Sequence, residues 1–138
     1  MDAPSAEELK EHPVVKAAFA AAWADSFPDD SALRHEEGGF IYANPTTGEI
    51  IVRRAPPGLM RLLDLTHPPS VPGAFLVATY HTHPNPIALG WNPDPSDDDR
   101  ELAEGSGLPW FVISELGVDF AGPSRRVNGL SGSPGYPM

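Results

Sequence analysis

A nearly continuous apolar run, residues 74–80, leads directly into the segment His81-Thr82-His83-Pro84. The run has the length of a strand, and its apolar character predicts a central strand buried on both faces. Side chains of a strand alternate with period 2, so His81 and His83 project from the same face at the end of this strand. Their imidazoles can therefore converge on one ion, at the place where a ligand crevice normally opens in an α/β sheet.

A run of serine and aspartate, residues 96–99, follows His83 after twelve intervening residues. It looks like the start of a short helix from Ser96 to about Glu104, stopped by Gly105. Two histidines and one carboxylate, with a fourth position open for water, are typical of a catalytic rather than a structural zinc site. Taken alone, Ser96-x-x-Asp99 also reads as an ordinary capping box at a helix start.

The length of 138 residues predicts one compact domain. We expect it to span residues 1–122, and we expect residues 123–138, rich in Gly, Ser and Pro, to form a flexible C-terminal tail. Seventeen prolines make long helices improbable outside the N-terminal third.

The charge and the missing cysteines exclude several classes of function. A formal net charge of −10 argues against nucleic acid as a partner, because a nucleic-acid backbone needs a basic footprint. With no cysteine, the chain has no disulfide, no thiolate nucleophile and no Cys-ligated zinc. No apolar run approaches membrane-spanning length and no secretory signal is visible, so a cytoplasmic location is the default, with specialised secretion left open.

The remaining patterns predict helices around a mixed sheet. An apolar stripe over about residues 5–25 indicates an N-terminal helix that Pro13 breaks in two. The predicted strands are 39–43 and 49–53, joined as a hairpin by the turn 44–48, then 110–114 and 118–121. Residues 59–65 fit either a short strand or a helical turn. The fold class is therefore α/β (α+β), with a central mixed β-sheet flanked by helices.

A candidate general base stands before the hairpin, in the segment His35-Glu36-Glu37-Gly38-Gly39. A metal-dependent hydrolase needs such a base, and the glycines let the backbone approach its neighbours closely. Either glutamate could serve, and taken alone the two read as an ordinary solvated acidic pair.

Together, Glu36-x-x-Gly39, His81-x-His83-Pro84 and Ser96-x-x-Asp99 resemble the motif of the JAMM (JAB/MPN-type) metallopeptidases. The resemblance covers about residues 15–122 and is strongest to the small bacterial JAB-like branch. It implies a JAB/MPN-like, cytidine-deaminase-like architecture and a zinc-dependent peptidase or isopeptidase.

The resemblance also implies a role for each residue of the motif. His81, His83 and Asp99 would bind one Zn²⁺ per chain. Glu36, favoured over Glu37 by the motif spacing, would hold the metal-bound water, take its proton and pass it to the leaving amine. Ser96 would hydrogen-bond the developing oxyanion. The substrate would be a protein or peptide, such as the C-terminal tail of a ubiquitin-like protein.

Several alternatives stay open at this point. A catalytically silent JAB/MPN scaffold that binds a partner is the main rival, and an effector module of a bacterial toxin system is another setting for the same chemistry. Iron or manganese fits two histidines and a carboxylate as well as zinc does. A zinc nucleoside deaminase is excluded, because its motif needs cysteines.

The loop between the second histidine and the serine departs from the family pattern, with twelve residues where about seven are usual. Trp91 in this loop is either a hydrophobic plug or a substrate-facing aromatic. The other aromatic and basic candidates have ordinary interpretations: Trp110 in the core, the remaining histidines at the surface or in loops, and Arg125 and Arg126 solvated in the tail.

Overall fold

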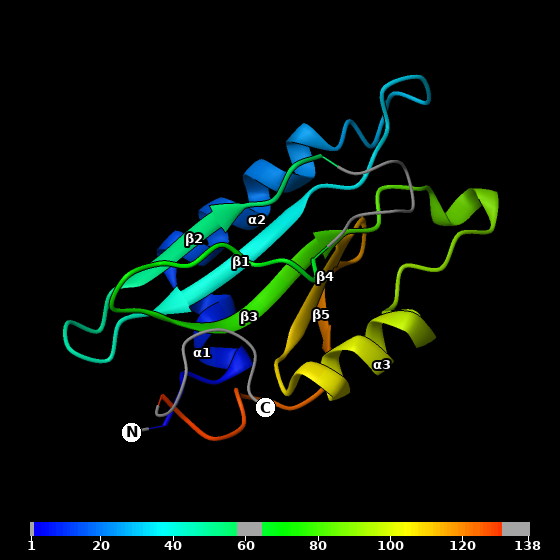
Figure 1. Cartoon of the computed structure of the whole chain (residues 1–138). Coiled ribbons are helices and arrows are strands. Elements are labelled where there is room, and N and C mark those ends of the chain that lie inside the picture. Colours follow the sequence, from blue (N-terminus) through cyan, green and yellow to red (C-terminus); the bar gives the residue numbers. More distant parts are fainter. Residues whose placement is uncertain (1, 58–64, 131–138) are drawn as a thin grey trace.

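Strand β3 (Phe75–Thr82) is the centre of a five-stranded sheet of order β2-β1-β3-β4-β5 (Figure 1). This computed structural model describes residues 2–57 and 65–130. The other strands are β1 (Gly38–Ala43), β2 (Ile50–Arg54), β4 (Trp110–Ser114) and β5 (Gly117–Ala121). β3 and β4 are parallel and the other pairs are antiparallel, so the sheet is mixed as predicted.

Two N-terminal helices, α1 (Ala6–Glu11) and α2 (Pro13–Asp25), cover one face of the sheet (Figure 1). The predicted break at Pro13 is confirmed: Pro13 takes the first position of α2, where its missing N–H costs nothing, and the His12 side chain caps that helix. Phe19 of α2 packs against the rings of Tyr80 and Phe111, with centroids 5.3 and 5.2 Å away.

The opposite face carries α3 (Asp97–Ser106), which links β3 to β4 (Figure 1). A parallel pair of strands needs a crossover, and α3 runs back along the sheet to provide it. The N-terminus of α3 therefore lies near the end of β3, beside the two histidines. The helix does not stop at Gly105 as expected; it ends at Ser106 and is followed by the C-cap Gly107, whose φ of 68° is the left-handed conformation that such a glycine adopts.

The loop between β3 and α3 contains a single 3₁₀ turn, η1 (Ile87–Leu89). Leu89 is 69% exposed, and the turn ends at Gly90 with φ of 89°. This is the enlarged segment that departs from the family spacing, and in Figure 1 it extends away from the sheet.

Residues 123–130 were expected in a flexible tail, but they pack onto the domain. Arg126 is 2% exposed and donates to the Leu76 carbonyl at 2.9 Å, so it is not solvated as predicted. The carbonyl of Ser124 accepts the Ala6 N–H at 2.6 Å. Residues 131–138 lie outside the described residues, as do residues 58–64, which include most of the ambiguous segment 59–65.

None of the helices in residues 2–57 and 65–130 combines the length and the apolar character needed to cross a bilayer.

Candidate metal centre

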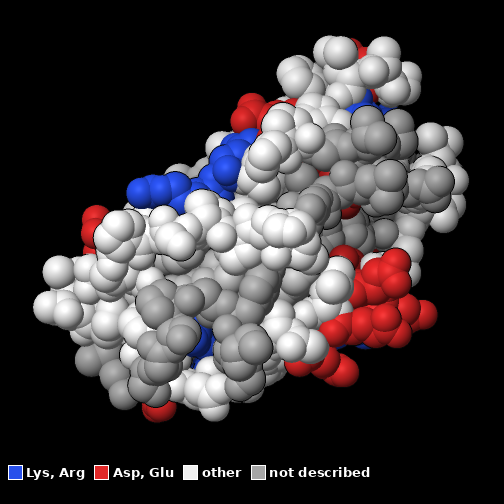
Figure 2. Space-filling view, in the orientation of Figure 1, with Lys and Arg blue, Asp and Glu red and all other residues white. Residues whose placement is uncertain are grey.

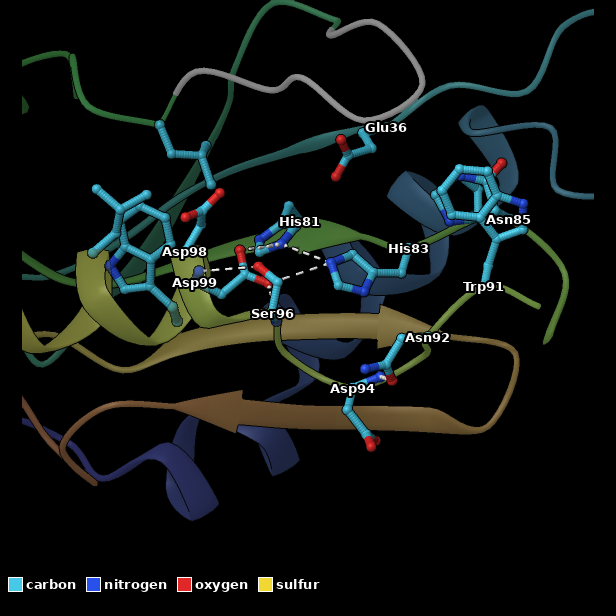
Figure 3. Close-up of a pocket in the computed structure, with 14 residues that line it drawn as sticks. Glu36, His81, His83, Asn85, Trp91, Asn92, Asp94, Ser96, Asp98 and Asp99 are labelled. Atoms are coloured by element: carbon cyan, nitrogen blue, oxygen red, sulfur yellow. Dashed lines mark hydrogen bonds and ion pairs between the residues drawn. The ribbon is translucent and has the colours of Figure 1, made fainter.

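His81 and His83 lie at the end of β3 with their ring nitrogens together, as their spacing predicts (Figure 3). His83 lies one residue beyond the strand, but its N–H donates to the Ile113 carbonyl at 2.7 Å, which continues the pairing with β4. The alternation of side chains therefore persists through His83. The two Nε2 atoms are 3.2 Å apart, and His81 is 4% exposed.

Asp99 reaches both histidines from the first turn of α3. Its Oδ1 lies 3.1 Å from Nε2 of His81, and its Oδ2 lies 3.4 Å from Nε2 of His83. Burial alone would raise the pKa of Asp99, but hydrogen bonds from both histidines, the charge of His81 and the Ser96 N–H hold that pKa well below its usual range. The carboxylate is therefore ionised and able to act as an anionic ligand.

The capping box at the start of α3 orients this carboxylate. The Ser96 Oγ accepts the Asp99 N–H at 3.1 Å, and the Asp99 Oδ2 accepts the Ser96 N–H at 2.8 Å. The capping-box interpretation of Ser96-x-x-Asp99 is therefore confirmed, and the same cap turns the carboxylate toward the histidines. Because the Ser96 hydroxyl acts as an acceptor in this cap, it keeps its own proton for a further acceptor.

Glu36 approaches the histidine pair from the side opposite Asp99 (Figure 3). The antiparallel register pairs Gly38 with His81, and continuing it by two residues sets Glu36 opposite His83. Ligand atoms of Glu36, His81 and His83 all lie within 4.8 Å of one another, and Glu36 is 7% exposed. These three residues could hold a metal ion.

Glu37, the alternative base, is engaged elsewhere. Its carboxylate accepts from the Arg54 guanidinium at 2.7 Å and lies 2.6 Å from Nε2 of His35. It is 3% exposed and is not among the residues that line the cavity around the histidines. The fold thus gives the two adjacent glutamates different environments, and His35, expected as an ordinary surface or loop histidine, holds Glu37.

Gly39 completes the Glu-x-x-Gly motif for a steric reason. A Cβ at this position would collide with the backbone oxygen of Arg53 on the neighbouring strand. The expected close backbone approach is therefore present, and glycine keeps β1 and β2 paired immediately after Glu36.

A cavity of about 500 Å³ opens over these groups. Two tryptophans contribute to its wall. Trp110 is buried in the core as predicted, and its ring lies edge-on to that of His81 with centroids 6.4 Å apart. Trp91 comes from the enlarged loop and is half-buried. The lining is Glu36, Leu65, His81, His83, Pro84, Asn85, Trp91, Asn92, Asp94, Ser96, Asp98, Asp99, Leu102 and Trp110. The five predicted site residues are all among them.

Sequence reasoning missed most of the remaining wall. Leu65, Asn85, Asn92, Asp94 and Leu102 carry no motif spacing, and only the fold brings them to the cavity. Figure 2 shows acidic side chains gathered over α3, where exposed aspartates and glutamates continue outward from the cavity rim. The described lining contains neither Lys nor Arg.

The donor set fits a divalent cation. Imidazole nitrogen and carboxylate oxygen are the ligands that zinc accepts in catalytic sites, and iron and manganese also accept them. Two ring nitrogens 3.2 Å apart also need a shared proton or a cation between them, since two lone pairs at that distance repel. Burial alone would lower the pKa of His83, but its hydrogen bond to Asp99 and the charges of Asp99 and Glu36 raise that pKa above its ordinary value. The site thus attracts positive charge.

The sequence model of one protein family, described as prokaryotic homologs of the JAB domain, matches residues 12–127. The match leaves out α1 and covers α2, α3, the whole sheet and every residue of the candidate centre. No curated protein and no solved structure gave a significant match.

Proposed function

This chain belongs to the prokaryotic JAB-domain family, and from that premise we propose that it is a metal-dependent peptidase or isopeptidase. The observation that carries the proposal is that Glu36 and Asp99 approach the ring nitrogens of His81 and His83 from opposite sides within one cavity (Figure 3). These four groups come from the segment before β1, the end of β3 and the first turn of α3, so the arrangement depends on how these elements pack together.

His81, His83 and Asp99 are the proposed ligands of one zinc ion. Asp99 is assigned as a ligand because the capping box holds it in place and both of its oxygens face histidine nitrogens. When bound, zinc supplies Lewis acidity, which polarises a carbonyl and lowers the pKa of water.

Glu36 is the proposed general base. Its carboxylate accepts the proton of the attacking water and delivers it to the leaving amine nitrogen as the amide bond breaks. Its position opposite Asp99 leaves it within reach of the reacting atoms while Asp99 remains with the histidines (Figure 3). The Ser96 hydroxyl, whose proton is not used by the cap, donates to the carbonyl oxygen as negative charge develops there.

A protein or peptide is the proposed substrate. Its backbone would lie extended beside the cavity and be held by main-chain hydrogen bonds, as in β-strand addition. Leu65, Leu102 and the two tryptophans offer apolar contact to its side chains. The C-terminal tail of a ubiquitin-like protein is one such extended segment, and it is the candidate that we would test first.

Metal stoichiometry and cleavage test the proposal together. We expect about one zinc per chain in protein purified without chelators, lost in His83→Ala and kept in the matched control His67→Ala, an exposed histidine outside the cavity. Glu36→Gln should keep the zinc and lose cleavage of a linear peptide library and of lysine-branched peptides, both analysed by mass spectrometry.

Two results would overturn the proposal in different ways. Wild-type protein that takes up no zinc even when zinc is offered does not have the proposed zinc centre. Wild-type protein that binds zinc but cleaves linear and branched peptides no faster than Glu36→Gln does is a binding scaffold instead of an enzyme.

A further inference from the structure

Thr82, the residue between the two histidines, faces the other side of β3 and contacts the segment that carries Glu36. It is fully buried. Its Oγ1 accepts the Glu37 N–H at 3.0 Å and lies 2.7 Å from the Ser26 Oγ. One strand end therefore presents His81 and His83 to the cavity and Thr82 to the backbone next to Glu36.

The direction of these hydrogen bonds follows from counting protons. The Ser26 hydroxyl donates its one proton to the Ala22 carbonyl at 2.8 Å, so Thr82 must be the donor in the bond between the two hydroxyls. The chain of donors runs from the Glu37 N–H through Thr82 and Ser26 to Ala22. Every hydroxyl in it donates once and accepts once, and such chains strengthen cooperatively in a buried setting.

Both neighbours of Glu36 are held by backbone hydrogen bonds, one to the end of β3 and one to the residue that caps α2. The Thr82 N–H donates to the Glu37 carbonyl at 2.9 Å, and the His35 N–H donates to the Ser26 carbonyl at 3.1 Å. The Glu37 side chain is fixed between Arg54 and His35. The backbone on both sides of Glu36 is thus tied to β3 and to the C-terminal end of α2.

We propose that Thr82 and Ser26 are positioning residues that hold the Glu36 carboxylate at a set place relative to His81 and His83. The proposal rests on the proposed function, in which Glu36 is the general base. A general base displaced by about 1 Å can lose on the order of 100-fold in rate. Removing the Thr82 hydroxyl leaves the buried Glu37 N–H without its acceptor, which frees the segment on one side of Glu36.

The test compares Thr82→Val, which keeps the shape and removes the hydroxyl, with Thr82→Ser, which keeps the hydroxyl. In Thr82→Val we expect kcat to fall on the order of 10- to 100-fold with KM and zinc stoichiometry unchanged. Thr82→Ser should restore kcat to within a few-fold of wild type. The kcat of Ser26→Ala, whose hydroxyl is one hydrogen bond further from Glu36, should lie between the kcat values of Thr82→Val and Thr82→Ser.

Amide hydrogen exchange of the metal-free protein gives a second readout that needs no substrate. The Glu37 amide should exchange at least about tenfold faster in Thr82→Val than in wild type or Thr82→Ser. Thr79→Val is the matched control: Thr79 is equally buried on β3, its hydroxyl has no hydrogen-bond partner within residues 2–57 and 65–130, and its loss should leave Glu37 exchange unchanged.

Unchanged Glu37 exchange in Thr82→Val would overturn the proposal whether or not the protein is an enzyme. Equal losses in Thr82→Val and Thr82→Ser would also overturn it, because the hydroxyl would then be irrelevant. A wild-type protein that binds zinc and cleaves nothing would instead overturn the proposed function of Glu36, while faster Glu37 exchange in Thr82→Val would still show that Thr82 holds the segment.

Discussion

The Asp99 carboxylate lies 3.1 Å from Nε2 of His81, and the two residues come from a helix start and a strand end that are far apart in the chain. The crossover from β3 to β4 brings them together, and the capping box with Ser96 sets the orientation of the carboxylate. A local helix-start motif therefore has a second use in the candidate centre. The first two predictions separate these uses.

Asp99→Asn should weaken zinc binding by at least about 100-fold, because it replaces an anionic ligand with a neutral amide while keeping the size of the side chain. Asp98→Asn is the matched control, since Asp98 also lines the cavity but has no described contact with either histidine. Competition with a chromogenic chelator measures both affinities. Equal zinc affinities for the two variants would remove Asp99 from the ligand set.

Ser96→Ala should lower kcat by about 10²–10³-fold and destabilise the fold by about 1 kcal/mol, through loss of an oxyanion donor and of a helix cap. Ser5→Ala removes the equivalent cap of α1, where the Ser5 Oγ accepts the Glu8 N–H at 3.1 Å, far from the cavity. It should cost similar stability and no activity. Activity in buffer without denaturant separates the two roles of Ser96. If Ser96→Ala lost no more activity than Ser5→Ala does, Ser96 would act only as a cap.

Tyr42 should make stability fall at alkaline pH. Burial raises the pKa of its phenol to about 12, despite the opposing charge of Arg53, and its hydroxyl donates to the Pro69 carbonyl at 2.5 Å. Since the folded-state pKa exceeds the unfolded value of about 10, the stabilisation is complete below pH 10 and is lost as the pH rises toward 12.

Tyr42→Phe should cost about 1 kcal/mol at neutral pH, from the lost hydrogen bond, and should reduce the slope of stability against pH above pH 10. Some slope will remain, because burial also raises the pKa of Tyr80. Denaturant unfolding at several pH values measures both effects. An unchanged alkaline slope in the variant would contradict the assignment to Tyr42.

Arg126→Ala should destabilise the domain by about 1–3 kcal/mol, because it leaves the Leu76 carbonyl without its donor and removes a guanidinium stacked 5.2 Å from the Phe75 ring centroid. Its neighbour Arg125 has a side chain that is 45% exposed, so Arg125→Ala should cost less than about 1 kcal/mol. Thermal and urea unfolding compare the two. Equal small losses would mean that residues 123–130 contribute little to the fold.

Local chemistry in the sequence was enough to predict most of the elements. Pro13 breaks the N-terminal helix, the turn at 44–48 joins a hairpin, and the apolar run before His81 is the central strand, as expected. The end of α3 was misjudged because an exposed helix tolerates one glycine, and Gly105 has open space around it. Arg126 was misjudged because its burial depends on Leu76 and Phe75, which no spacing in the tail reveals.

For the candidate centre, the residue types can be read from the chain: two histidines two residues apart, a helix-start aspartate and a pair of glutamates, of which the Glu-x-x-Gly spacing favours Glu36. The fold gives the two glutamates different surroundings: Arg54 and His35 hold the Glu37 carboxylate, and Glu36 lies at the cavity. It also placed Leu65, Asn85 and Leu102 in the wall. Periodicity acts over a few residues and can be read from the chain, whereas contacts between separate elements depend on how the sheet assembles.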